Sequence, residues 1–305
     1  MSNDNVQPSR ASKLRRALRD RLIGAGRTAP ALIAPGIYDG YGARMVAEAG
    51  FEAGYMTGNG VSACLLGRPD VGLVDLTLMA AHARNVASCM DLPLICDADT
   101  GYGSVVNMRR TVQEFEAAGV AGIHIEDQIS PKRCAQFPGA RTVLAFNEAV
   151  NKIAAAVAAR DDADFLIIGR TDSAGSMGID EAIKRAQAFE RVGAGAVFVE
   201  IKAHAGILDD LKRVADAVAI PCMVNVDAGG PLFELKSDAL HRYGIGIAIY
   251  PALVRNAVGF AMREALGQLK RDGSTAAARP RMISGAEYAE VLGLEEVGAW
   301  EGKFS

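Results

Sequence analysis

Two aspartates separated by a single residue are the sharpest chemical feature of this sequence. Asp97 and Asp99 directly follow the apolar run Leu92–Cys96. Alternate residues of an extended strand share a face, so both carboxylates can point the same way. Two like charges this close repel each other unless a cation or a proton lies between them. The pair indicates either a metal site or an aspartate that merely caps the following helix.

A third carboxylate favours the metal site. Glu126 follows a second apolar run, Gly122–Ile125, and would lie beside the aspartates if the two runs are neighbouring strands. Oxygen donors without cysteine or clustered histidine select a hard cation, Mg²⁺ or Mn²⁺, over zinc. We therefore expect a hard divalent cation at this position.

Arg170 also follows an apolar run, Phe165–Ile168. A buried guanidinium needs an anionic partner, and a substrate carboxylate is one such partner. An ion pair within the protein, with Asp172 or Glu200, is the alternative. The residues Thr57, Gly58 and Asn59 could offer backbone N–H groups to a carboxylate at a helix start, although an ordinary turn would have the same composition.

A long basic segment, Ser130–Val143, is bounded by proline and glycine. Loops of this length in a barrel are usually functional lids or else disordered. Cys134 lies in it among Lys132, Arg133 and Arg141, and such a cationic setting favours a reactive cysteine. The alternative is an inert loop thiol.

Short apolar runs that end in polar residues or glycine recur eight times. They are Ala31–Ala34, Ala53–Met56, Leu92–Cys96, Gly122–Ile125, Phe165–Ile168, Ala196–Val199, Pro221–Val224 and Ile245–Ile249. Segments with helical spacing separate them, and this alternation predicts a parallel sheet. Eight such units in about 250 residues fit an α/β fold of the closed (β/α)₈ type, whose active site lies at the C-terminal ends of the strands.

We expect one (β/α)₈ barrel domain over residues 1–305, in which residues 251–305 form a helical extension. Its predicted helices are Val254–Leu269 and Gly285–Leu292. They could pack on the outside of the barrel or exchange with a neighbouring subunit.

The composition narrows the class of partner. A net charge of −3 gives no basic excess for nucleic-acid binding, and no apolar run has the length of a membrane span. Five cysteines without a Cys-x-x-Cys pair argue against a disulfide framework. With a polar N-terminus that lacks a signal-peptide pattern, we expect a cytoplasmic protein.

Several motifs resemble one enzyme family. In order along the chain they are Y-M-T-G-N-G, C-D-A-D-T-G-Y-G, G-I-H-I-E-D-Q, P-K-R-C, G-R-T-D, F-V-E, V-N-V and I-Y-P. This set resembles the isocitrate lyase and phosphoenolpyruvate mutase superfamily. It is most similar to the short lyases of that family, exemplified by 2-methylisocitrate lyase and dimethylmalate lyase.

The resemblance implies a helix-swapped barrel, assembled as a homotetramer (a dimer of dimers), with Mg²⁺ at its mouth. Asp97 and Asp99 would hold the metal, and Asp70 and Glu126 would help to fix its hydration shell. A small carboxylate substrate would be bound by Thr57, Gly58, Asn59, Arg170, Glu200 and Asn225. The catalytic residues would be Cys134, Tyr55 and Arg170, with Cys134 as the general acid.

Two departures from the family pattern concern the substrate. The lyases continue the P-K-R-C motif with Gly-His, where this chain has Ala135 and Gln136. Asp227, after the seventh run, would disfavour an extra substrate carboxylate. Both changes indicate a smaller or less charged substrate than isocitrate or methylisocitrate.

The expected reaction is cleavage of a carbon–carbon bond in a 2-hydroxy di- or tricarboxylate. Tyr55 or a water network would accept the hydroxyl proton, an oxo acid such as pyruvate or glyoxylate would leave, and Cys134 would protonate the other fragment. Three alternatives stay open: an oxaloacetate decarboxylase, a phosphonate P–C bond enzyme, and a non-catalytic carboxylate-binding barrel.

Overall fold

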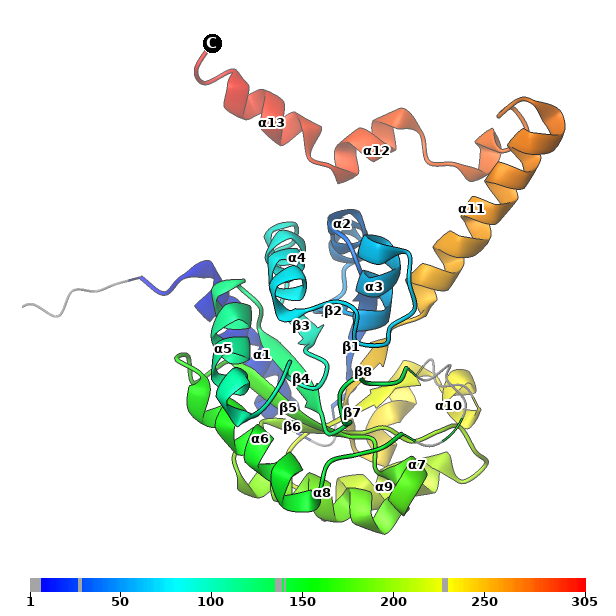
Figure 1. Ribbon diagram of the computed structural model, residues 1–305. Coiled ribbons are helices and arrows are strands. Elements are labelled where there is room, and N and C mark those ends of the chain that lie inside the picture. Colours follow the sequence, from blue (N-terminus) through cyan, green and yellow to red (C-terminus); the bar gives the residue numbers. More distant parts are fainter. Residues whose placement is uncertain (1–6, 27–28, 135–138, 140, 227–229) are drawn as a thin grey trace, which may run out of the picture.

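The computed structural model describes residues 7–26, 29–134, 139, 141–226 and 230–305, and within them eight parallel strands close into a barrel (Figure 1). Each strand pairs with the next along the chain, and β8 pairs with β1. The strands are β1 (Leu32–Ile37), β2 (Gly54–Met56), β3 (Leu94–Asp97), β4 (Gly122–Glu126), β5 (Leu166–Thr171), β6 (Ala196–Val199), β7 (Cys222–Asn225) and β8 (Ile245–Tyr250). The predicted barrel is confirmed, and every predicted run overlaps one strand.

Helices alternate with the strands. The longer ones are α2 (Gly40–Glu48), α3 (Gly58–Leu66), α4 (Leu76–Ser88), α5 (Val105–Ala117), α6 (Phe146–Ala159), α8 (Ile179–Arg191) and α9 (Ile207–Ala217). Short ones are α7 (Ala174–Met177), α10 (Pro231–Glu234) and the 3₁₀ helix η2 (Ser237–Tyr243). Polar side chains begin several of them, as in α4, where Asp75 accepts a hydrogen bond from the N–H of Leu78 at 2.9 Å.

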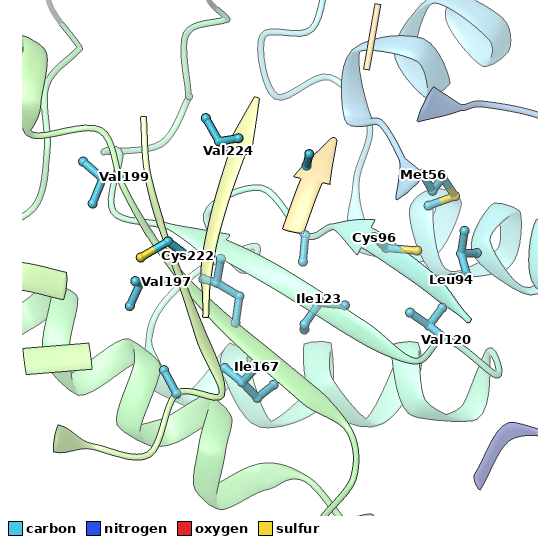
Figure 2. Close-up of a cluster of buried hydrophobic side chains, with 14 of the residues drawn as sticks. Met56, Leu94, Cys96, Val120, Ile123, Ile167, Val197, Val199, Cys222 and Val224 are labelled. Carbon is cyan, nitrogen blue, oxygen red and sulfur yellow. The ribbon is translucent and has the colours of Figure 1, made fainter. Parts of the chain in front are cut away.

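The strands contribute to two cores because successive side chains point to opposite faces. Outward residues such as Met56, Ile123 and Val197 lie around the barrel (Figure 2). They belong to one buried cluster with apolar residues of the surrounding helices. Inward residues such as Ile95, Ile168 and Phe198 fill the barrel interior.

The inward positions change character along each strand. Ile95 is followed two residues later by Asp97, Ile168 by Arg170, and Met223 by Asn225. These polar residues are within the strands, not just beyond them as the sequence suggested. The period of two therefore delivers apolar side chains to the base of the barrel and polar ones to its C-terminal mouth.

An N-terminal helix, α1 (Arg10–Ala25), packs against the barrel interior, and the sequence did not predict it. Leu18 and Leu22 are buried in the same cluster as the inward strand residues. Their spacing with Leu14 is helical, but arginines and a lysine on the other faces hide it. This helix covers the inward-facing residues at the base of the barrel.

The C-terminal extension leaves the barrel (Figure 1). It comprises α11 (Leu253–Asp272), η3 (Arg279–Arg281), α12 (Gly285–Val291) and α13 (Leu294–Glu301), so both predicted helices are confirmed. The rings of Tyr41 and Tyr288 lie 5.7 Å apart and connect α2 to α12. Large apolar side chains of the extension are exposed, including Phe260, Leu266 and Trp300. No helix in the described ranges is long and apolar enough to cross a membrane.

Candidate active site

A cavity of about 410 Å³ opens at the C-terminal ends of the strands. The residues expected from the sequence that line it are Tyr55, Thr57, Asn59, Asp70, Asp97, Glu126, Cys134, Arg170, Glu200 and Asn225. Gly58 and Asp99 do not line the cavity, but both adjoin Asp97: a Cβ added at Gly58 would lie 2.7 Å from Asp97 Oδ2, and the N–H of Asp99 donates to Asp97 Oδ1. The fold thus gathers ten of the twelve expected residues around one cavity and places the other two next to Asp97.

The two aspartates are held in place by strained backbone. Asp99 (φ 49°) and Tyr102 (φ 58°) adopt left-handed conformations that non-glycine residues rarely occupy. The backbone N–H of Asp99 donates to Asp97 Oδ1 at 2.9 Å, and the N–H of Glu126 donates to the carbonyl of Asp99 at 2.9 Å. These bonds fix the turn that brings both carboxylates beside β4.

A lysine lies among these carboxylates. Nζ of Lys132 donates to Asp70 Oδ2 at 2.9 Å, lies 3.8 Å from Asp97 Oδ2, and contacts Asp99 Oδ1. Burial opposes ionisation of Asp97, but Lys132, His124 and Arg170 outweigh it and keep its pKa well below the usual range. Burial and the neighbouring carboxylates instead raise the pKa of Asp99 well above its usual value.

The donor set fits a hard divalent cation. Asp70, Asp97, Asp99 and Glu126 offer only oxygen atoms, and the missing side chain of Gly58 leaves the Asp97 carboxylate uncrowded. Among the described residues, however, no three carboxylate, histidine or thiol side chains converge closely enough to form a metal centre. The ammonium of Lys132 lies among these carboxylates, within 4 Å of Asp70, Asp97 and Asp99.

Arg170 has several anionic partners. It makes two contacts of 3.1 Å with Asp172, and it lies 3.3 Å from Glu126 and 3.8 Å from Glu200. Its guanidinium also stacks 4.9 Å above the Phe198 ring. The ion pair within the protein, one of the two alternatives drawn from the sequence, is therefore present, and Arg170 still lines the cavity.

Tyr55 faces a buried histidine. Its hydroxyl lies 2.8 Å from Nε2 of His124, which is itself 3.7 Å from Asp97 Oδ1. Burial lowers the pKa of His124 to about 4 and raises the pKa of Tyr55 well above its usual value. At neutral pH the pair is an uncharged phenol beside an uncharged imidazole.

The start of the basic segment is tied to the strand ends. The backbone N–H of Arg133 donates to Gln128 Oε1 at 2.9 Å, and Gln128 Nε2 donates to Glu126 Oε1 at 2.8 Å. Cys134, partly buried, thereby lies on the cavity wall. Ala135, Gln136 and Asp227, from which a smaller substrate was inferred, lie outside the described residues.

Polar residues at the starts of α3 and α11 and at the end of β7 also line the cavity. Thr57 caps α3, and its hydroxyl accepts from the N–H of Gly60 at 3.4 Å. Arg255, at the start of α11, hydrogen-bonds to Asn59 Oδ1. Oδ1 of Asn225 is buried with no hydrogen-bond partner in the part of the chain that the structure describes, so it is available to a bound molecule.

Three residues that take part in these contacts were not predicted as site residues from the sequence. His124 stands two positions before Glu126, so strand periodicity could have placed it inside the barrel. Lys132 was considered only as a neighbour of Cys134. Arg255 carries no local signal, because its place in the cavity depends on where α11 leaves the barrel.

Comparisons with known proteins agree on the family. The family model described as phosphoenolpyruvate phosphomutase matches residues 26–270. The chain is 39% identical to 2,3-dimethylmalate lyase of Eubacterium barkeri, covering 87% of this chain and 91% of the relative. It is also 39% identical to a probable 2-methylisocitrate lyase of Corynebacterium glutamicum, covering 93% and 91%.

Solved structures of enzymes with other activities are also similar to this chain. Oxaloacetate acetylhydrolase with the inhibitor 3,3-difluorooxalacetate superposes with a TM-score of 0.87 at 32% identity, covering 96% of this chain and 97% of that one. Phosphonopyruvate hydrolase with oxalate and Mg²⁺ gives 0.84 at 30% identity, covering 95% and 98%. Lyases, hydrolases and mutases therefore share this fold, and the chain belongs to the phosphoenolpyruvate mutase and isocitrate lyase superfamily of enzymes.

Proposed function

We propose that this protein is a magnesium-dependent carbon–carbon lyase. Its substrate is a small 2-hydroxy dicarboxylate of the dimethylmalate type, with 2-methylisocitrate-like tricarboxylates as the larger limit. The products are an oxo acid, pyruvate or glyoxylate, and a second carboxylate. The similarity to 2,3-dimethylmalate lyase supports this choice among the family's reactions.

The observation that carries the proposal is the placing of Tyr55 and Cys134 around one cavity. A retro-aldol cleavage needs an acceptor for the hydroxyl proton and a donor for the carbon that becomes negative. A phenol paired with a histidine and a thiol on the wall of the same space supply this acceptor and this donor.

The proton transfers follow from these positions. Tyr55 passes its own proton to Nε2 of His124 while its oxygen accepts the proton of the substrate's 2-hydroxyl, so the imidazole ends this step protonated. As that hydroxyl loses its proton, a C=O bond forms and the adjacent C–C bond breaks. Arg170 stabilises the charge of the departing carboxylate fragment, and Cys134 donates a proton to its carbanionic carbon.

Asp97 and Asp99 would hold Mg²⁺, with Asp70 and Glu126 fixing its hydration shell. The bound cation supplies positive charge that orients and polarises the oxygens of the substrate. The carboxylate oxygens of the substrate would be bound by Thr57, Gly58 and Asn59, while Glu200 and Asn225 surround the remainder.

The assembly is part of the proposal. The exposed apolar residues of α11, α12 and α13 fit a helix exchanged between subunits, and we propose a homotetramer in the cytoplasm. Sedimentation of the full chain and of a chain ending at Gly273 tests this: the first should be tetrameric and the second smaller.

A product assay tests the reaction. Release of pyruvate and glyoxylate should be measured over a panel of 2-hydroxy di- and tricarboxylates, oxaloacetate and phosphonopyruvate, with Mg²⁺ and with EDTA. We expect metal-dependent cleavage of a hydroxy acid into two products in equal amounts. Turnover of oxaloacetate or phosphonopyruvate alone would assign a decarboxylase, hydrolase or P–C bond enzyme instead, and ligand binding without product would indicate a binding protein.

A further inference from the structure

Lys132 occupies a distinctive place in the cavity. It is buried, and its ammonium contacts Asp70 and Asp99 and lies near Asp97. In the proposed function these three carboxylates hold the divalent cation and its hydration shell. The ammonium of Lys132 and the proposed divalent cation would therefore bind to the same three carboxylates.

Two cations cannot share this cluster without cost. The ammonium already compensates part of the carboxylates' charge, and like charges a few ångströms apart repel each other strongly where water is largely excluded. A divalent cation that binds here must either push Lys132 away from Asp99 or bind less tightly than the carboxylates alone would allow.

Lys132 is also close in sequence to the proposed acid. Only Arg133 separates Lys132 from Cys134, and the backbone N–H of Arg133 donates a hydrogen bond to the side chain of Gln128. The side chain of Gln128 in turn donates a hydrogen bond to Glu126. Lys132 and Gln128 therefore both connect the carboxylates to the segment that carries Cys134. A shift of Lys132 therefore changes the setting of the Cys134 thiol.

We propose that Lys132 is a positioning residue that competes with the divalent cation for Asp70, Asp97 and Asp99, and so couples metal binding to the placement of Cys134. This inference rests on the metal site and on the role of Cys134 in the proposed function. A lysine that served only to hold the fold together would act differently, since its removal would loosen the carboxylates and weaken metal binding.

Binding of Mn²⁺, measured by electron paramagnetic resonance without substrate, separates these cases. We expect Lys132→Met, which keeps an unbranched side chain one atom shorter and removes its charge, to bind Mn²⁺ at least 10-fold more tightly than the wild type. Lys202→Met is the matched control. Lys202 lines the same cavity, but its described hydrogen bond is to the carbonyl of Gly139, so its loss should change the affinity less than 2-fold.

Alkylation of Cys134 gives a second readout. The rate of its reaction with iodoacetamide, resolved by peptide mass spectrometry, should change at least 5-fold with Mn²⁺ in the wild type. In Lys132→Met it should be insensitive to Mn²⁺. The exposed Cys64 serves as an internal reference whose rate the metal should leave unchanged.

The outcomes distinguish this inference from the proposed function. Equal or weaker Mn²⁺ binding by Lys132→Met, or a Cys134 rate indifferent to Mn²⁺ in the wild type, overturns the inference alone. Lack of Mn²⁺ binding by both proteins overturns the proposed metal site and the inference with it. If Lys132→Met does not fold, as judged by circular dichroism, Lys132→Gln is measured against the same thresholds.

Discussion

The two ends of the barrel use the same residue types in opposite ways. At the base, Arg16 of α1, whose side chain is largely exposed, pairs with Asp164 at 3.4 Å. At the mouth, Arg170 pairs with Asp172 at 3.1 Å where both side chains are buried. Exposed pairs contribute little to stability, whereas at the mouth the cost of burial is outweighed by the buried carboxylates around Arg170, which raise its pKa above the usual value.

This difference follows from strand periodicity and from α1. The inward residues at the base are apolar, and Leu18 and Leu22 of α1 seal them from water. The inward residues at the mouth carry charge and face the cavity. We infer that the base supplies stability and the mouth supplies chemistry, and that single substitutions can separate the two.

The largest effect should come from the carboxylates of the mouth. We expect Asp99→Asn to lower kcat/KM by about 10³-fold or more, equivalent to about 4 kcal/mol, because it removes a carboxylate ligand from the proposed metal site. Steady-state kinetics with the best substrate of the panel measures it. Asp91→Asn, at an exposed position paired with Arg10, is the control and should retain activity. Equal losses in both variants would contradict the separation.

A core substitution at the base should show the reverse pattern. We expect Leu18→Ala to lower the free energy of unfolding by about 3 kcal/mol, within the range for buried leucines, because it opens a cavity under the barrel. Denaturation in urea measures the loss. The kcat per folded molecule should stay within about 2-fold of the wild type, and a fall comparable with that of Asp99→Asn would show that base and mouth are not independent.

A buried histidine should make the mouth sensitive to acid. The pKa of His124 falls from 6.5 to about 4 on folding, so the unfolded chain binds more protons between these values. Stability is therefore kept above pH 6.5 and lost progressively as the pH falls to 4, by about 3 kcal/mol in total. Thermal unfolding of the wild type and of His124→Gln from pH 4 to 8 measures this, and the variant should lose less. Parallel pH profiles would refute the assignment.

The smallest effect on stability should come from an ion pair at the base, between Arg16 and Asp164. Arg16→Gln breaks an ion pair whose arginine is largely exposed, so we expect a change of about 1 kcal/mol or less in the free energy of unfolding. The change should shrink further in 1 M NaCl, since salt screens exposed charges. A larger, salt-independent loss would mean that the pair holds α1 in place.

The sequence predicted the parts of the molecule that depend on local pattern. The eight strands and the carboxylate pair Asp97 and Asp99 were found because apolar runs and their polar ends are visible in the chain. The helix α1 was missed because its arginines, which pair with aspartates and carbonyl groups of the base, hid the apolar stripe through Leu18.

The contacts inside the cavity could not be predicted in the same way. The pairing of Lys132 with Asp70 joins residues 62 positions apart, and that of Arg255 with Asn59 joins residues 196 apart. Such contacts depend on how loops and α11 cross the mouth, which periodicity does not encode. The motifs identified the residues around the cavity, whereas their hydrogen bonds required the three-dimensional arrangement.

The central claim is tested most directly by one comparison of turnover numbers. With the hydroxy acid that gives most product in the presence of Mg²⁺, kcat should be measured for Cys134→Ser and, as its matched control, for Cys64→Ser. The account predicts a loss of about 100-fold or more in Cys134→Ser, because a hydroxyl is a much weaker acid than a thiol, and less than 2-fold in Cys64→Ser. Equal activity of the two variants would contradict the assignment of the mouth as a lyase that uses Cys134 as its acid.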